Sequence, residues 1–191
     1  MQNFKRIATG IDTTLLLEGL EKHPELWDII TARQNTPDSP HTDTKCIFLR
    51  GPKELTINSI FHDLESVDYD SLKTYFPFMN DIHGLLGKLI DQDSNVDPIG
   101  RVMIVSLKTG GVITKHIDEG DYADHHKRYH LVLQSDPLNI FYSETEDKIE
   151  EVHMTPGELW WFDHKAPHWV ENMSDRERIH IIFDIKKAMV Q

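Results

Sequence analysis

The chain has 191 residues, of which 39% are hydrophobic and 27% are charged. A chain of this length buries about two-thirds of its unfolded surface in one core, so its ordinary composition excludes a disordered or fibrous class. The net charge of −12 excludes unspecific binding to nucleic acid, because a phosphate backbone would repel such a chain.

Three features of the sequence bear on its cellular location. Residues 1–10 lack the apolar stretch of a signal peptide, and no segment has the ~18 apolar residues of a membrane span. The single cysteine, Cys46, cannot form an internal disulfide and lies in an apolar run, which is typical of a buried core thiol. We therefore expect a cytoplasmic protein that does not bind a membrane.

The first half of the chain is predicted to be mostly helical, with one or two strands. Apolar residues at helical spacing predict an amphipathic helix over 12–33, which Pro24 breaks or kinks near its middle. A polar, proline-broken loop follows at 34–45 and leads to a short strand at 46–50. The helical pattern returns over 71–91.

The apolar residues of the second half alternate with a period of two instead. Eight short strands are predicted there, at 101–107, 112–118, 128–134, 138–143, 148–153, 158–162, 168–172 and 178–185. Such strands predict a mainly β fold, a sandwich or jelly roll, with the N-terminal α-helices packed on one sheet. We expect a single domain over 1–191, with a helical support region at 1–97 and a core at 98–191 that carries the active site.

Histidine is enriched in the chain, and eight of its twelve histidines lie between His116 and His180. Non-haem iron(II) is held on one face by two histidines and one carboxylate, which leave three positions open. Residues i and i+2 of a strand share a face, so one strand can supply two of these ligands.

The pattern His-x-Asp/Glu occurs three times, which is near chance frequency, so only its context separates the copies. The copy at 23–25 lies in a helical pattern, where i and i+2 point apart, and the copy at 41–43 lies in the loop. The third copy ends a predicted strand and follows a Gly-Gly turn. We therefore expect His116 and Asp118 to be metal ligands.

The third ligand must come from a distant strand. Its candidates are the other histidines of the second half, His125, His126, His130, His153, His164, His168 and His180. His168 opens a predicted strand after Pro167, a position that projects a side chain into the mouth of a barrel, and we expect it to be the ligand. His164 lies in the preceding turn, where a solvated side chain is expected.

A cosubstrate with two carboxylates needs a buried cation as well as the metal, and arginine binds a carboxylate through two N–H groups. Arg178 begins an apolar strand ten residues after His168, where a charge needs a partner. Arg176 shares its parity but lies nearer the turn. Arg128 and His130 share a face of an earlier strand and form a second cationic pair, although Arg128 could equally pair with one of the 32 acidic residues.

These motifs resemble the aspartyl/asparaginyl β-hydroxylase family of Fe(II)- and 2-oxoglutarate-dependent oxygenases. The resemblance rests on Arg-x-His-Leu-x-Leu at 128–133, His-x-Val-x-Asn at 168–172 and Arg178, and it covers about 101–185. It implies a double-stranded β-helix, a cupin-like fold with the metal and cosubstrate in its open mouth. It also implies Fe(II), 2-oxoglutarate and O2 as cofactors, with succinate and CO2 as co-products of a hydroxylation.

The resemblance also assigns residues to roles. It makes His116 and His168 iron ligands, and it makes Arg178 the partner of the distal carboxylate of 2-oxoglutarate. Arg128 and His130 match residues near the carboxylate that chelates iron.

Of two further positions, one matches the family and the other departs from it. Ser106 matches a hydroxyl contact to the distal carboxylate, and it shares the parity of Val102 and Ile104, which is expected to face inward. Asp118 is a departure, because some animal members lack a carboxylate there. The complete triad is more like that of bacterial members, which include amino-acid hydroxylases.

Three functions stay open at this level. The first is a hydroxylase of a free amino acid or a derivative, and the second is a hydroxylase of Asp, Asn or a similar side chain in a protein. The third is a non-enzymatic cupin-like module that binds a metal or a small anion. We expect a small-molecule or peptide substrate. The loop at 119–124 could line its site or could equally be a solvated turn, and the tryptophans that crowd the ligands in sequence, Trp160, Trp161 and Trp169, are each more typical of the core.

Overall fold

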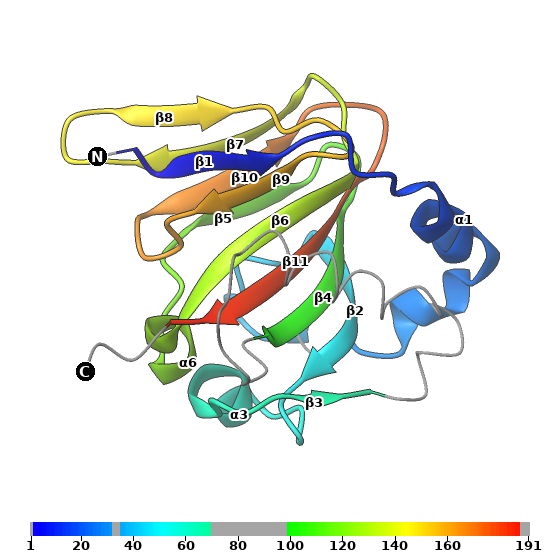
Figure 1. The fold of residues 1–191 in the computed structure, drawn as a ribbon, viewed down its shortest axis with the longest axis vertical. Coiled ribbons are helices and arrows are strands. Elements are labelled where there is room, and N and C mark those ends of the chain that lie inside the picture. Colours follow the sequence, from blue (N-terminus) through cyan, green and yellow to red (C-terminus); the bar gives the residue numbers. More distant parts are fainter. Residues whose placement is uncertain (1, 32–34, 70–98, 188–191) are drawn as a thin grey trace.

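The computed structural model describes residues 2–31, 35–69 and 99–187, which form two β-sheets with short helices at their edges (Figure 1). The strands are Phe4–Ala8 (β1), Thr44–Gly51 (β2), Val67–Asp68 (β3), Ile99–Leu107 (β4), Val112–His116 (β5), His126–Gln134 (β6), Asn139–Glu144 (β7), Ile149–Val152 (β8), Leu159–Phe162 (β9), His168–Asn172 (β10) and Arg178–Lys186 (β11). The larger sheet has the order β1-β9-β6-β11-β4-β2-β3, and the smaller has the order β5-β10-β7-β8. Neighbouring strands are antiparallel in both sheets.

The period-two pattern predicted this architecture correctly. Each of the eight strands expected in the second half is present, with its ends shifted by at most two residues, and the strand expected at 46–50 is part of β2. Two antiparallel sheets that share one apolar cluster form a jelly roll, so the predicted mainly β fold is confirmed.

The N-terminal helical segment is interrupted at the predicted position. Helix α1 (Thr14–Lys22) is followed by a 3-10 helix, η1 (Pro24–Asp28), because Pro24 cannot donate the hydrogen bond that would continue α1. The buried leucines of both helices, Leu16, Leu20 and Leu26, pack against the larger sheet. The expected packing of helices on one sheet is therefore confirmed, whereas the helix predicted over 71–91 lies outside the described residues.

Several elements were not predicted from the sequence. Strand β1 pairs with β9 at one end of the larger sheet, and the short β3 pairs with β2 at the other end. Two short helices, α3 (Ile57–His62) and α6 (Asp121–His125), lie together beneath the larger sheet in Figure 1. The division into a support region and a core stays a prediction. None of the helices in the described ranges is long and apolar enough to cross a membrane.

The central strands of the larger sheet, β4, β6 and β11, are buried on both faces. The outer face meets the N-terminal helices and carries residues such as Val102, Ile104, Leu131, Leu133, Ile181 and Phe183. The inner face meets the smaller sheet and forms a cluster with Leu107, Val132, Phe162, Ile113, Phe141 and Val170. The parity expected to face inward on β4, that of Val102 and Ile104, was therefore wrong, because both faces of this strand are apolar and alternation does not distinguish them.

A glycine shapes the connection between β5 and α6. Gly120 has φ 95° and ψ 164°, a backbone region that is essentially restricted to glycine. A Cβ atom there would lie 2.5 Å from the carbonyl oxygen of Phe61 in α3. The absence of a side chain therefore lets the segment that follows Asp118 lie directly against α3.

We predict that Gly120→Ala lowers the free energy of unfolding by about 2 kcal/mol or more, because it combines backbone strain with a clash against Phe61. Gly110→Ala is a matched control: Gly110 also has a positive φ, 64°, but a Cβ there would meet nothing within 4 Å. Urea denaturation of both variants measures the difference. Equal losses of stability would show that the contact with α3 does not matter.

Candidate active site

Three side chains meet where β5 and β10 pair. His116 ends β5, His168 begins β10, and the register of the two strands places them opposite each other. Asp118 is held beside them because its backbone N–H donates to the carbonyl of His164, at 3.1 Å. One ligand atom from each of the three residues lies within 4.8 Å of the others. The structure thus brings together the three residues that were predicted as metal ligands.

The hydrogen bonds of the two histidines suit a metal. Nδ1 of His116 donates to the carbonyl of Thr114 at 2.7 Å, and Nδ1 of His168 donates to the carbonyl of Ala166 at 2.9 Å. Because a carbonyl only accepts, each neutral ring carries its lone pair on Nε2. Nε2 of His116 is buried and has no hydrogen-bond partner among the described residues. Such backbone contacts are the usual support of metal-binding histidines, so the residues present fit Fe(II).

Arg128 joins two buried carboxylates. Its Nε and Nη2 donate to the two oxygens of Asp184 at 2.8 and 3.0 Å, and its Nη1 donates to Asp118. Burial alone would raise the pKa of Asp118, but the Arg128 guanidinium holds that pKa well below its usual range. Asp118 is therefore a carboxylate at neutral pH, as a metal ligand must be. The ion pairing that the sequence left open for Arg128 is present, and its predicted contact with the cosubstrate stays a prediction.

A second polar group lies between the sheets. Arg178, His130 and His180 are 3%, 4% and 0% exposed, and each has a side-chain nitrogen without a partner among the described residues: Nη2 of Arg178 and Nε2 of both histidines. Burial lowers the pKa of Arg178 to about 9, which leaves it charged at neutral pH. Buried polar atoms without a partner are rare in proteins and require an explanation, of which a bound ligand is one.

Two aromatic rings connect this group to the metal triad. Phe162 packs against His168 and His130, with ring centroids 5.1 Å away from each. Phe141 lies 6.0 Å from the ring of His168, and the Arg178 guanidinium lies 5.6 Å from the Phe141 ring centre. The two rings thus form apolar contacts that the triad and the group around Arg178 share.

His180 was weighed from the sequence only as a metal ligand, and the structure gives it a different environment. It follows Arg178 by two residues on β11, so the two side chains share the inner face. The rule that places i and i+2 of a strand on one face would have grouped it with Arg178.

Ser106 does not lie with the buried polar group of Arg178, His130 and His180. It lies opposite Ile179 on β11, whereas Arg178 lies opposite Leu107, so Ser106 and Arg178 are on different faces of the sheet. The Ser106 hydroxyl donates to Glu177 at 3.0 Å. This placement follows from the parity error on β4, and we leave Ser106 out of the proposed site.

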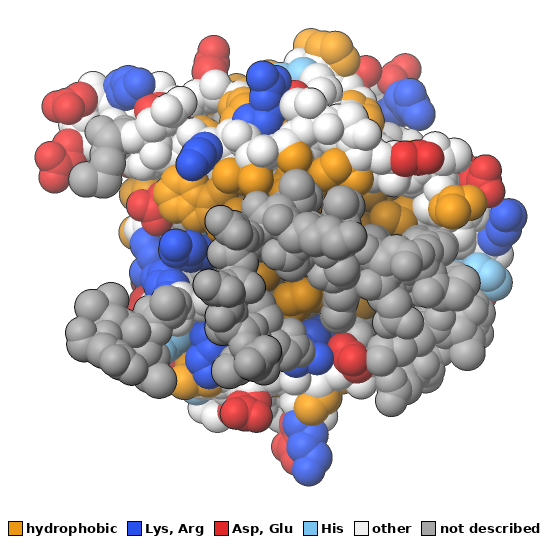
Figure 2. Space-filling model, viewed as in Figure 1, with side chains coloured by type: hydrophobic (Ala, Val, Ile, Leu, Met, Phe, Trp, Pro, Cys, Tyr) orange, Lys and Arg blue, Asp and Glu red, His pale blue; other side chains and the backbone are white. Residues whose placement is uncertain are grey.

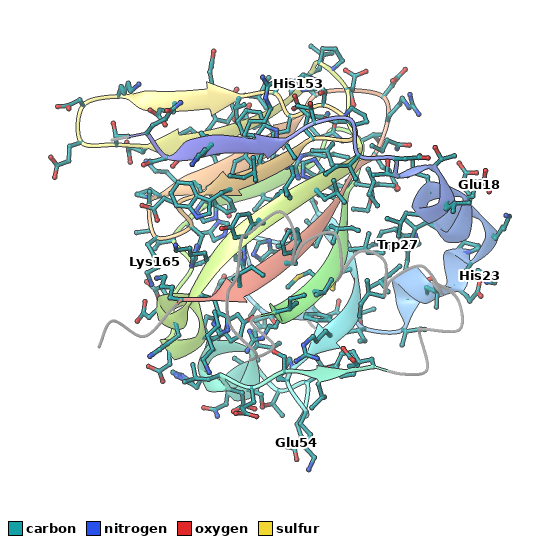
Figure 3. The ribbon with its side chains drawn as sticks, viewed as in Figure 1. Glu18, His23, Trp27, Glu54, His153 and Lys165 are labelled. Carbon is teal, nitrogen blue, oxygen red and sulfur yellow. The ribbon has the colours of Figure 1, made fainter. Side chains whose placement is uncertain are left out.

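The other histidines have separate partners. His164 is buried rather than solvated as expected, because Nε2 of its ring donates to the carbonyl of Ala123. His126 is also buried and bonds to the carbonyl of Tyr122. His153 lies by the smaller sheet (Figure 3), where Nδ1 bonds to the carbonyl of Asn139. Among the described residues, only His116 and His168 combine with a carboxylate into a group that could hold a metal.

A cavity of about 520 Å³ opens beside the triad. Its described lining comes from the segment 36–41, from α3 and α6, and from the inner face of the larger sheet, and it includes His116, Asp118 and Arg128. The loop at 119–124, for which the sequence left open a substrate site or a solvated turn, contributes Glu119, Tyr122 and Ala123 to that lining. The tryptophans 160, 161 and 169 are not among the described lining residues.

Trp160 and Trp169 contact residues outside the described cavity lining, and charges of both signs lie on the surface. Trp169 stacks on Tyr142 with ring centroids 5.0 Å apart, and Nε1 of Trp160 donates to Glu158 at 2.9 Å. On the face shown in Figure 2, acidic and basic side chains are interspersed over the described surface. Lys165, labelled near α6 in Figure 3, bridges the backbone carbonyl of Asp118 and the carboxylate of Asp124.

The three candidate ligands are of the types that hold non-haem iron(II), and comparison with known proteins gives the family. The aspartyl/asparaginyl β-hydroxylase family model matches residues 79–188. This is more than half of the chain, and the protein therefore belongs to that family. The predicted resemblance is confirmed.

One curated relative is the L-proline cis-4-hydroxylase of Rhizobium meliloti (strain 1021), which is 29% identical over 101 residues. The match covers 53% of this chain and 35% of the relative, so the chain matches only about a third of that protein's length.

Solved structures share the fold at low identity. A prolyl-4-hydroxylase from Pseudomonas putida aligns over 98% of this chain and 94% of its own, with a TM-score of 0.53 and 12% identity. A Trichoplax adhaerens prolyl hydroxylase, solved with a hypoxia inducible factor peptide fragment, aligns over 96% and 83%, with a TM-score of 0.57 and 15% identity. A 2OG-Fe(II) oxygenase from Burkholderia pseudomallei has a TM-score of 0.57 and 11% identity over 75% and 66%. The double-stranded β-helix is thereby confirmed.

We predict that His168→Ala weakens Fe(II) binding by about 100-fold or more, because one of three protein ligands is lost. His125→Ala is the control, since His125 is exposed and its ring bonds only to the carbonyl of Asp121. Anaerobic titration with Fe(II) measures both affinities. An unchanged affinity in His168→Ala would remove His168 from the triad.

We also predict that Asp184→Asn weakens Fe(II) binding by about 10-fold, because Arg128 would lose one of the charges that orient it toward Asp118. The exposed Asp147 provides the matched control, Asp147→Asn. The same titration applies, with the melting temperature followed in parallel. If Asp184→Asn lowers the melting temperature but leaves the Fe(II) affinity intact, the contact serves stability alone.

Proposed function

We propose that the protein is an Fe(II)- and 2-oxoglutarate-dependent dioxygenase that hydroxylates an amino acid or an amino-acid side chain. One observation carries the proposal: the candidate metal ligands His116, Asp118 and His168 share the apolar rings Phe141 and Phe162 with a buried polar group in which Nη2 of Arg178 has no described partner. A metal with open positions and a buried cation beyond it are what a dicarboxylate cosubstrate requires.

The residues of the chain would divide the work as follows. His116, Asp118 and His168 hold the iron, and the negative charge of Asp118 offsets part of the iron's charge. Arg178 binds the distal carboxylate of 2-oxoglutarate, with His130 between Arg178 and the triad. When bound, the iron and 2-oxoglutarate supply the oxidative chemistry: O2 is reduced, 2-oxoglutarate becomes succinate and CO2, and one oxygen atom enters a C–H bond of the substrate.

The cavity beside the triad is the proposed substrate site. Phe48, Met103 and Ile60 provide apolar surface, while Arg101 is a buried cation stacked over the ring of Tyr122 at 3.4 Å. Its Nη1 and Nη2 donate to the backbone carbonyls of Ser59, Ile60 and Asp63, and its Nε has no partner among the described residues. Apolar surface beside a buried cation suits a substrate that carries a carboxylate on a largely apolar frame, as amino acids do.

The comparisons support this substrate class. The curated relative bears the name of a hydroxylase of L-proline, and the Trichoplax enzyme was solved with a peptide fragment. Hydroxylation of a side chain within a peptide is the second candidate, and the description of the family favours it.

Anaerobic addition of Fe(II) and 2-oxoglutarate tests the proposal directly. We expect the weak visible charge-transfer band of the chelate and, in air, succinate release that a free amino acid or a short peptide stimulates. A screen of both substrate kinds separates the two candidates. If no band forms and no candidate stimulates succinate release, the protein is a non-enzymatic binding module instead.

We predict that Arg178→Ala raises the dissociation constant of 2-oxoglutarate by about 100-fold, because the cosubstrate's distal carboxylate loses its buried partner. Arg176→Ala is the matched control, since Arg176 is exposed and its guanidinium bonds only to the side chain of Gln134. Titration of the charge-transfer band gives both constants. An effect in Arg176→Ala and none in Arg178→Ala would show that Arg176, rather than Arg178, binds the distal carboxylate.

A further inference from the structure

Two buried histidines form a direct pair on the inner face of the larger sheet. His130 lies on β6 and His180 on β11, and these strands are neighbours. Their Nδ1 atoms are 3.3 Å apart, within hydrogen-bonding distance, and the ring planes are nearly perpendicular, at 84°. Neither ring reaches water, because both residues are less than 5% exposed.

A bond between two Nδ1 atoms constrains the protonation of both rings. Burial, together with the nearby Arg178 guanidinium, holds the pKa of each histidine well below its usual range, so both rings are neutral. A neutral imidazole has one N–H and one lone pair. One ring must therefore be protonated on Nδ1 and the other on Nε2, and only the second presents an N–H on its far side.

The surroundings indicate which ring is which. The His130 ring packs against Phe141 and Phe162, the two rings that also contact His168 of the triad. The ring contact of His180 among the described residues is with His130. His130 therefore faces the proposed cosubstrate site, and His180 stands behind it.

The chemistry of the cosubstrate decides which of the two rings carries its proton on Nε2. A carboxylate or keto oxygen of 2-oxoglutarate can only accept a hydrogen bond from the protein. The ring that faces it must therefore carry its proton on Nε2, and Nε2 of His130 is one of the buried atoms without a partner. The lone pair is then left on Nε2 of His180.

We propose that His180 is a positioning residue whose Nδ1–H donates to Nδ1 of His130, which fixes His130 as the Nε2–H tautomer and makes it a hydrogen-bond donor to bound 2-oxoglutarate. The identity of the ligand rests on the proposed function. That the two rings are opposite tautomers does not, because it follows from the histidine pair itself, whereas the choice of His130 as the Nε2–H ring does. Loss of such a supporting contact typically weakens ligand binding by about 10-fold or more.

The tautomers can be read without activity or metal. In metal-free protein labelled with ¹⁵N-histidine, long-range proton–nitrogen correlation spectra distinguish protonated from unprotonated ring nitrogens. We expect protonated Nε2 in His130 and protonated Nδ1 in His180. The opposite assignment would overturn the proposal.

Two substitutions test the consequence for binding. His180→Phe keeps a ring but removes the donor, whereas the side-chain nitrogen of Asn in His180→Asn occupies nearly the place of Nδ1. With anaerobic Fe(II) protein and calorimetric titration, we expect His180→Phe to weaken 2-oxoglutarate binding by about 10-fold with unchanged Fe(II) affinity, and His180→Asn to recover most of the loss. In His180→Phe, the His130 resonances should also show mixed tautomers.

The outcomes separate this inference from the proposed function. If the unaltered protein binds Fe(II) but not 2-oxoglutarate, the proposed function fails while the tautomer assignment is still measured. If 2-oxoglutarate binds equally to the unaltered protein and to His180→Phe, the positioning role is wrong and the proposed function stands. Should His180→Phe fail to fold, His180→Asn and the spectra of the unaltered protein still decide the tautomers.

Discussion

The site depends on one ionic contact that joins the two sheets. Arg128, on the larger sheet, binds Asp184 of the same sheet and Asp118, which extends from the smaller sheet. All three side chains are at most 15% exposed, so loss of the guanidinium would leave two poorly hydrated carboxylates beside each other. Breaking a buried pair in this way typically costs about 3–5 kcal/mol. The contact therefore ties the two sheets together beside the metal triad and keeps Asp118 charged.

From this contact, polar side chains continue inward along two neighbouring strands. The inner face of β6 carries Arg128, His130 and Val132. The inner face of β11 carries Asp184, Ile182, His180 and Arg178. A fold selected for stability alone would place apolar residues along such a line, because each buried polar group without a partner costs free energy. The outer face of the same strands does so, with Leu131, Leu133, Ile181 and Phe183. The asymmetry indicates that the inner face serves a ligand.

The sequence predicted the metal triad for a physical reason that is local. His116 and Asp118 are two residues apart at a strand end, and His168 opens another strand, so their spacing alone restricts where they can meet. The strands themselves were predictable because turn residues separate short alternating segments. Strand β1 was missed because five residues with two exposed charges, Lys5 and Arg6, give little alternation.

What the sequence by itself determined is the eight strands of the second half and the likeness to the β-hydroxylase family, and it predicted a metal triad together with a distant cosubstrate arginine. What only the tertiary structure decided is which face each central strand turns inward. β4, β6 and β11 are buried on both faces, so periodicity could not tell Ser106 from Leu107 or reveal that His180 lies against His130. Those choices follow from the packing of helices on one face and of the smaller sheet on the other, which are contacts between segments far apart in the chain.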